Sequence, residues 1–172
     1  MDVLITGEPG AGKTTICEKL VELLKDKGLT CGGVLSPISE DGFDIVDVKT
    51  GKTKPFAKVA VGDAAIGKFN FDNEGINFAL KALENSNNCS VTFIDEIGPL
   101  ELGGEGLMPS VKSLADSDGA LVVIARSWLS EKVKGLFPKR EFLVFEVTEA
   151  NRDALPEEVL VSFLENNEKI SR

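Results

Sequence analysis

The sequence predicts an α/β fold of three layers, in which helices cover both faces of a mostly parallel β-sheet. Short apolar runs alternate along the chain with longer stretches of helical period, the pattern typical of this class. The chain has 172 residues, 42% of them hydrophobic, which is enough for one core. We therefore expect a folded chain with a single domain over residues 1–172.

Short apolar runs that suit both faces of a buried parallel sheet are the expected strands. They are Val3–Thr6, Leu29–Ser36, Val91–Ile94, Ala120–Ala125 and Phe142–Val147. The stretches between them have the apolar spacing of amphipathic helices. These are Lys13–Lys27, Asn73–Glu84, Leu107–Ala115, Leu129–Leu136 and Glu157–Asn166.

Residues 37–60 interrupt this alternation. Two strand-like runs, Phe43–Val48 and Thr53–Val59, flank the turn-forming segment Lys49–Lys52. Such a pattern predicts an antiparallel β-hairpin. We expect it to be inserted into the core after the second strand, without forming a second domain.

The charge balance excludes several classes of partner. There are 19 basic and 28 acidic residues, a formal net charge of −9, so the surface as a whole repels polyanions and no nucleic-acid partner is expected. The apolar run Ala120–Ala125 is far shorter than the roughly 20 residues of a membrane span. Met1–Val3 lacks the basic region that begins a signal peptide. We expect a cytoplasmic protein without membrane association, and no protein partner is indicated.

The absence of histidine restricts the chemistry further. Mechanisms that use a Ser-His-Asp or Cys-His arrangement cannot be written for this chain. The three cysteines, Cys17, Cys31 and Cys89, lie far apart, so a structural zinc site is not expected. Any catalysis must therefore use carboxylates, lysine, hydroxyls, backbone amides or a hard cation such as Mg²⁺.

The segment GEPGAGKT at Gly7–Thr14 fits the pattern GxxxxGK[ST] of a phosphate-binding P-loop, between an apolar strand and an amphipathic helix. Glycines let the backbone wrap around a phosphate, and the helix N-terminus favours its negative charge. We expect Lys13 to reach the β- and γ-phosphates and the Thr14 hydroxyl to bind Mg²⁺. The predicted nucleotide-binding residues here are Gly7, Glu8, Pro9, Gly10, Ala11, Gly12, Lys13, Thr14 and Thr15.

The strand Val91–Ile94 runs directly into two acids, Asp95 and Glu96. By itself this pattern is common, but a P-loop needs a partner acid for Mg²⁺. We expect Asp95 to hold the Mg²⁺ shell together with Thr14. Glu96 is expected to orient or deprotonate an attacking water, which indicates hydrolysis.

Basic residues also follow the later strands, at the edge where doubly wound sheets bind ligands. Arg126 comes after the fourth strand; it either contacts the transferred phosphoryl group as a catalytic residue or forms a surface ion pair. Asn151 and Arg152 follow the fifth strand. They either bind the base or ribose of the nucleotide or form a capping turn before Pro156.

Two further features have alternative interpretations. Trp128 is the only tryptophan, and such a residue belongs to the core more often than it serves as a platform for a base. Gly103, Gly104 and Gly106 form either a loop that enters the following helix or an element that rearranges with the γ-phosphate.

Four segments in order carry a wider resemblance. They are ITGEPGAGKTT at Ile5–Thr15, GGVLSP at Gly32–Pro37 with GFDIVDVKTG at Gly42–Gly51, FIDEIGPLEL at Phe93–Leu102 and VTEANRDALP at Val147–Pro156. Over nearly its full length the chain resembles the small P-loop nucleoside-triphosphatases, the family of the thermophilic and the cancer-related nucleoside-triphosphatases. This resemblance implies slow Mg²⁺-dependent hydrolysis of ATP, GTP and other nucleoside triphosphates, with broad base specificity, to diphosphate and phosphate. It also implies the P-loop fold of the additional-strand, catalytic-glutamate type.

Two other functions suit the same scaffold. A nucleotide or small-molecule kinase would need a second substrate site and a basic lid, and only four arginines are available. A nucleotide-dependent switch or adaptor would use slow hydrolysis to reset a binding surface. Phosphate release with and without phosphoryl acceptors separates the kinase from the hydrolase.

Overall fold

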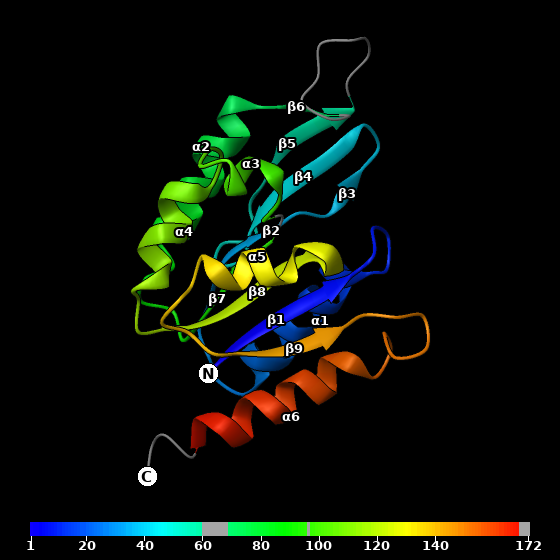
Figure 1. Ribbon diagram of the computed structural model, residues 1–172, viewed down its shortest axis with the longest axis vertical. Coiled ribbons are helices and arrows are strands. Elements are labelled where there is room, and N and C mark those ends of the chain that lie inside the picture. Colours follow the sequence, from blue (N-terminus) through cyan, green and yellow to red (C-terminus); the bar gives the residue numbers. More distant parts are fainter. Residues whose placement is uncertain (60–68, 96, 169–172) are drawn as a thin grey trace.

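The computed structural model describes residues 1–59, 69–95 and 97–168 of the chain. Within them it shows an α/β fold built on one mixed sheet of nine strands, in the order β6-β5-β4-β2-β7-β8-β1-β9, with β3 paired to β4. The part from β2 to β9 is parallel, and the part from β2 to β6 is antiparallel (Figure 1). The predicted class, α/β with helices on a largely parallel sheet, is confirmed.

The strands begin and end close to the predicted residues. They are β1 (Asp2–Gly7), β2 (Cys31–Leu35), β3 (Ile38–Ser39), β4 (Gly42–Asp47), β5 (Thr53–Val59), β6 (Phe69–Phe71), β7 (Val91–Ile94), β8 (Ala120–Arg126) and β9 (Phe142–Glu146). The helices are α1 (Lys13–Asp26), α2 (Asn73–Glu84), α3 (Pro99–Leu102), α4 (Met108–Ala115), α5 (Ser130–Gly135) and α6 (Leu155–Glu168), with a 3₁₀ turn over Ser127–Leu129. The short elements β3, β6 and α3 were not predicted.

Alternating residues of the strands pack into two hydrophobic cores, one on each face of the sheet. Val3 and Ile5 of β1 pack with α1 and α6, whereas Leu4 between them packs on the opposite face with α2, α4 and α5. The two sets of helices cover opposite faces in Figure 1. This alternation, which follows from the two-residue period of a strand, produces the three layers.

The predicted hairpin is present and is part of a larger antiparallel unit. β4 pairs with β5 in antiparallel register, and β5 pairs in turn with β6. α2 begins after β6 at a helix cap in which the Asp72 side chain accepts a hydrogen bond from the Gly75 backbone. The insertion therefore extends the sheet, and the predicted helix α2 packs both on it and on the parallel strands.

Two glycines let β2 lie unusually close to its neighbours. Gly33 has φ +90°, and a Cβ atom there would lie 2.0 Å from the carbonyl oxygen of Phe93 in β7. At Gly32 a Cβ would lie 2.7 Å from that of Ser86. Glycine is therefore required at Gly33 by the approach of β2 to β7, and at Gly32 by the segment between α2 and β7.

The expectation that every strand is buried on both faces is wrong for β9. β9 pairs with β1 alone, at the edge of the sheet, and Leu143 and Val144 are 37% and 45% exposed. Burial on both faces needs helices that extend past the strand on each side. At this edge the helices leave the middle of β9 uncovered.

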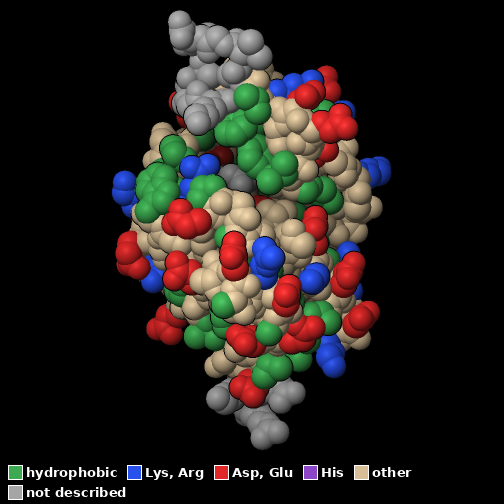
Figure 2. All heavy atoms as spheres, turned by 90° about the vertical axis from the view of Figure 1, so that its right-hand side faces the viewer, with side chains coloured by type: hydrophobic (Ala, Val, Ile, Leu, Met, Phe, Trp, Pro, Cys, Tyr) green, Lys and Arg blue, Asp and Glu red, His purple; other side chains and the backbone are tan. Residues whose placement is uncertain are grey.

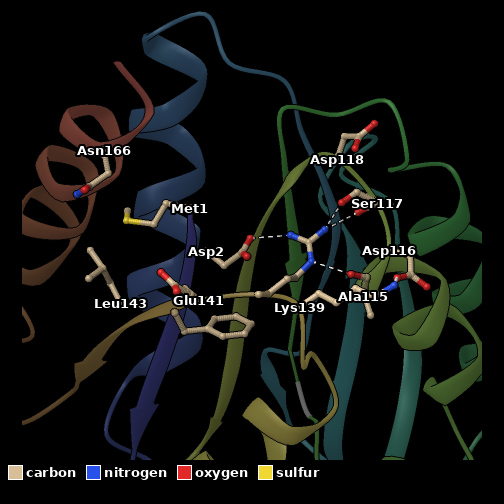
Figure 3. A pocket seen from close by; sticks show the side chains of 12 residues that line it. Met1, Asp2, Ala115, Asp116, Ser117, Asp118, Lys139, Glu141, Leu143 and Asn166 are labelled. Carbon is tan, nitrogen blue, oxygen red and sulfur yellow. Dashed lines mark hydrogen bonds and ion pairs between the residues drawn. The ribbon is translucent and has the colours of Figure 1, made fainter. Parts of the chain in front are cut away.

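A shallow pocket of about 870 Å³ lies at the amino ends of β1 and β9 (Figure 3). On its wall the Arg140 guanidinium is almost buried. It pairs with Asp2 at 2.8 Å and donates hydrogen bonds to the backbone oxygens of Leu114, Ala115, Ser117 and Gly119. Since these donors are occupied within the protein, Arg140 serves to join the end of α4 to β1.

No helix among residues 1–59, 69–95 and 97–168 is long and apolar enough to cross a membrane.

Candidate functional site

The predicted site residues that the structure describes lie toward the carboxyl ends of the parallel strands. Strands β2, β7, β8, β1 and β9 run parallel, so their carboxyl ends meet on one side. The P-loop follows β1, Asp95 follows β7, and Arg126 ends β8. Figure 2 faces this side and shows a hollow in its upper half, bordered by hydrophobic and basic side chains.

The loop backbone leaves the amino end of α1 open toward this side. Gly10 and Gly12 have φ of +79° and +96°, values that other residues rarely adopt. Gly12 is the N-cap of α1, and neither a side-chain cap nor an acidic residue occupies the first turn. The helix therefore presents uncapped N–H groups and the positive end of its dipole, the arrangement that binds phosphate.

Lys13 folds back over the loop. Its Nζ donates to the backbone oxygens of Gly7 at 2.9 Å and Glu8 at 2.8 Å. The ammonium group is thereby held against the loop backbone. Its position beside the open N–H groups suits a phosphate that both would contact.

Thr14 meets Asp95 across the site. The Thr14 Oγ1 donates to Asp95 Oδ2 at 2.9 Å, although the two residues are 81 positions apart. The same Asp95 oxygen accepts a hydrogen bond from the Ser36 backbone N–H at 3.0 Å. Asp95 is only 1% exposed, so the pairing of α1, β7 and the end of β2 holds this carboxylate in a fixed place.

Ser36 was not among the predicted site residues. It is 1% exposed, and its Oγ is the one buried side-chain nitrogen or oxygen in the described segments without a hydrogen-bond partner. An unsatisfied buried polar group costs about 1–3 kcal/mol. The sequence did contain a signal that Ser36 belongs to the site, because Ser36 comes at the end of an apolar strand, as Asp95 does.

The oxygen atoms of this site fit Mg²⁺. Magnesium takes hard oxygen ligands from one or two side chains and completes its shell with substrate phosphates and water. Thr14 and Asp95 supply such atoms, and Ser36, whose hydroxyl is unsatisfied, contacts the same Asp95 oxygen through its backbone N–H. No group of three or more Cys, Asp or Glu residues suited to a metal occurs among the described residues. The site therefore suits an ion that arrives with a phosphate ligand.

Glu96, the predicted water-directing residue, lies outside the described residues. The glycine segment after it is organised by Glu101, which is 3% exposed. Its two carboxylate oxygens accept from the N–H groups of Gly98 at 3.0 Å and Leu107 at 3.3 Å. Burial raises the pKa of Glu101 above its ordinary 4.5, against the lowering effect of these N–H groups. These bonds favour the interpretation as a structured loop into α4.

Arg126 is placed at the P-loop by the register of the sheet. Its Cα is the partner of Gly7, the first residue of the loop, in the β1–β8 pairing. The ion pairs found among the described residues do not include Arg126, which gives no support to the surface ion-pair alternative. Arg126 is half-buried at this position, beside the first residue of the P-loop.

Asn151 and Arg152 differ in their surroundings. The Asn151 side chain accepts from the Thr148 N–H and donates to the Glu146 carbonyl, both at 2.8 Å. It thus holds the turn between β9 and α6, as the capping-turn alternative predicts. Arg152 is exposed, and no ion pair within the described segments involves it, so its guanidinium can contact a ligand.

Trp128 does not belong to the core, contrary to expectation. It lies in the 3₁₀ turn directly after β8 and is 60% exposed. The neighbouring Leu129 takes the buried position instead, at 1% exposure. Two consecutive apolar residues in a tight turn cannot both point their side chains inward. Leu129 points inward, so Trp128 remains exposed.

The cysteine beneath the P-loop is not suited to act as a nucleophile. Cys17 is fully buried in α1. Burial, followed by the negative charges of Asp95 and Glu18, raises its pKa well above the ordinary 9.0. The thiol therefore stays protonated near neutral pH, and the thiolate is the reactive form.

Comparison with known proteins identifies the family. A family model described as NTPase matches residues 2–160. The nucleoside-triphosphatase THEP1 of Archaeoglobus fulgidus is 33% identical over 166 residues, covering 92% of this chain and 96% of that protein. The protein of the same name from Methanosarcina barkeri is 33% identical over 171 residues, covering 95% and 97%. The chain belongs to the THEP1 nucleoside-triphosphatase family.

Solved structures agree with the THEP1 assignment. The solution structure of a human cancer-related nucleoside triphosphatase has a TM-score of 0.74 and 26% identity, covering 94% of this chain and 96% of that one. The crystal structure of THEP1 from Aquifex aeolicus, at 24% identity over 92% and 96% of the two chains, has a TM-score of 0.71 and so shares the fold. The predicted enzyme class, a nucleoside-triphosphatase of the P-loop type, is thereby confirmed.

Proposed function

We propose that this THEP1 relative hydrolyses several nucleoside triphosphates to diphosphate and phosphate in a Mg²⁺-dependent reaction. The observation that carries the proposal is the 2.9 Å hydrogen bond between Thr14 at the head of the P-loop helix and the buried Asp95. This bond joins the phosphate-binding loop to a buried carboxylate. A turn that only bound a nucleotide would not require that carboxylate. Such a pair is what a phosphoryl-transfer site needs to hold Mg²⁺.

In this proposal different groups of the site bind different parts of the triphosphate and its metal ion. The uncapped N–H groups at the start of α1 and the Lys13 ammonium bind the β- and γ-phosphates. Thr14 and Asp95 hold Mg²⁺, which when bound neutralises charge on the phosphates. Arg126, the register partner of Gly7, stabilises negative charge on the transferred group.

Hydrolysis also needs a residue that orients water, and we assign this to Glu96, which follows Asp95 in the sequence. The water oxygen bonds to the γ-phosphorus while the bond from that phosphorus to the bridging oxygen breaks. The diphosphate leaves with the bridging oxygen, and the Glu96 carboxylate accepts a proton from the water. A chain without histidine has few other bases for this step.

The sheet order supports the finer assignment of the fold. β8 lies between β1, which leads into the P-loop, and β7, which leads into Asp95. An extra strand between these two is the feature that defines the additional-strand, catalytic-glutamate division named by the resemblance. We place the chain in that division and regard residues 1–172 as one domain with an inserted β-unit.

Broad base specificity follows from the contacts available. The P-loop contacts only phosphates, which all nucleotides share, and the exposed Arg152 can stack on any base face. A guanidinium stacked on the face of a base does not contact the hydrogen-bond donors and acceptors at the edge of that base, so it does not distinguish one base from another. We therefore expect similar turnover of ATP, GTP, CTP and UTP.

Phosphate release from these four nucleotides, with Mg²⁺ or with EDTA, tests the proposal. We expect release that stops in EDTA and in Lys13→Ala, and persists in Lys19→Ala, whose lysine lies exposed on the same helix. A panel of phosphoryl acceptors is added in parallel. Acceptor phosphorylation that outruns phosphate release would assign the chain to the kinases instead.

Glu96→Gln tests the assignment of the base. The amide keeps the shape of the side chain but loses the basic oxygen, so we expect turnover to fall about a hundredfold or more with nucleotide affinity retained. Glu105→Gln makes the same change at an exposed position nearby and is expected to have the parent rate. Parent turnover in Glu96→Gln would remove Glu96 from the mechanism.

A further inference from the structure

Ser36 lies beside the proposed metal site, and its side-chain hydroxyl has no hydrogen-bond partner in the described part of the chain. Its backbone N–H donates to the same Asp95 oxygen that accepts from Thr14. The hydroxyl belongs to the same residue and lies at the same strand end. It is fully buried, and neither side chain nor backbone in the described part of the chain satisfies it.

A purely structural role does not account for this hydroxyl. A buried O–H that lacks a partner destabilises the fold, so an alanine at position 36 would serve the packing at least as well. Ser86 offers the contrast. It is equally buried, at 1% exposure, but its Oγ donates to the Leu83 carbonyl at 2.6 Å.

The surroundings of Ser36 indicate the ligand of its hydroxyl. A serine O–H donates one hydrogen bond and accepts others. The Asp95 oxygen that the Ser36 backbone contacts also accepts from Thr14, and Thr14 and Asp95 are the residues assigned to Mg²⁺. Magnesium retains several waters when it binds to proteins, and these waters need hydrogen-bond partners. We propose that Ser36 is a positioning residue whose hydroxyl holds a water of the Mg²⁺ shell beside Asp95. This inference rests on the proposed function.

Metal affinity is the appropriate measurement. Mn²⁺ serves as the probe, counted as free ion by electron paramagnetic resonance in the presence of a non-hydrolysable ATP analogue. We expect Ser36→Ala to weaken Mn²⁺ binding about tenfold. Its affinity for the analogue in EDTA should be unchanged. Ser36→Thr, which retains the hydroxyl, should restore most of the Mn²⁺ affinity.

Thermal stability of the metal-free protein provides the second readout. Ser36→Ala should melt at the parent temperature or above, because it removes an unsatisfied group. Ser86→Ala should melt lower and bind Mn²⁺ as the parent does. A lower melting temperature for Ser36→Ala, with unchanged Mn²⁺ affinity, would show a structural hydroxyl and overturn the inference.

Other results separate this inference from the proposed function. An equal loss of analogue affinity with and without Mn²⁺ would mean that the hydroxyl contacts a phosphate, and would overturn the role in the metal shell. If the parent binds Mn²⁺ tightly and Ser36→Ala binds it equally well, the inference about Ser36 is overturned and the proposed function stands. If the parent protein with analogue binds no Mn²⁺, the proposed Mg²⁺-dependent function itself fails.

Discussion

Arg140 and Asp2 form an almost fully buried ion pair at the amino end of β1. Their side chains are 10% and 7% exposed, with Arg140 Nη1 2.8 Å from Asp2 Oδ1. The same Asp2 oxygen accepts from the Leu121 N–H at 2.7 Å. One guanidinium thereby fixes the start of β1 to the start of β8 and to the end of α4.

Arg140→Ala is expected to destabilise the protein strongly. It leaves the Asp2 carboxylate buried without its cation and frees several carbonyls at the end of α4, at a cost of about 3–5 kcal/mol. Lys139→Ala is the control, because the neighbouring Lys139 pairs with Asp116 in solvent and such pairs contribute little. Urea unfolding of both variants measures the difference. Similar losses for both would contradict the structural role of Arg140.

Gly33→Ala is expected to prevent the normal pairing of β2 with β7. The new Cβ would lie 2.0 Å from the Phe93 oxygen, and backbone atoms cannot move aside without separating the strands. We expect a loss above about 4 kcal/mol, or no folded protein. Gly28→Ala has a similar φ, +79°, but open space around the Cβ, so about 1 kcal/mol is expected. Equal melting temperatures would show that β2 and β7 lie further apart.

Asn151→Ala and Arg152→Ala are expected to affect different quantities. Asn151→Ala removes two hydrogen bonds to the turn and should lower the stability by about 1 kcal/mol. Arg152→Ala should leave the melting temperature unchanged and raise KM for ATP and GTP by similar factors, on the order of tenfold. Steady-state kinetics and thermal melts on each variant measure both. A KM effect confined to Asn151→Ala would reverse the assignment.

Glu101 is expected to make stability depend on pH. Because burial raises its pKa in the folded state above 4.5, its ionisation favours unfolding. The stabilisation from the protonated form is therefore complete below about pH 4.5 and is lost as the pH rises through the folded pKa. The side chain introduced by Glu101→Gln cannot ionise, so the stability of the parent relative to this variant should fall as the pH rises above about 4.5. Urea unfolding across this range measures the trend. A rise instead would mean that the N–H groups of Gly98 and Leu107 outweigh burial.

Local sequence signals predicted most of the elements and the family motifs. The helix Asn73–Glu84 and the strand Val91–Ile94 end where predicted, since apolar periodicity and polar turns are local properties. The P-loop was recognisable for the same reason, because its chemistry lies within one continuous segment. The short elements β3, β6 and α3 were missed because they are stabilised by pairing and packing rather than by periodicity.

The sequence by itself determined the layered class, the P-loop and the strand-end position of Asp95, because each depends on residues close together in the chain. Only the tertiary structure decided that Ser36 and Thr14 meet on one oxygen of Asp95, that Arg140 is a buried clamp and that β9 is an edge strand. These facts depend on the order of strands in the sheet and on which helix covers which strand. Contacts between residues as distant as Asp2 and Arg140 leave no periodic trace in a single sequence, so packing alone establishes them.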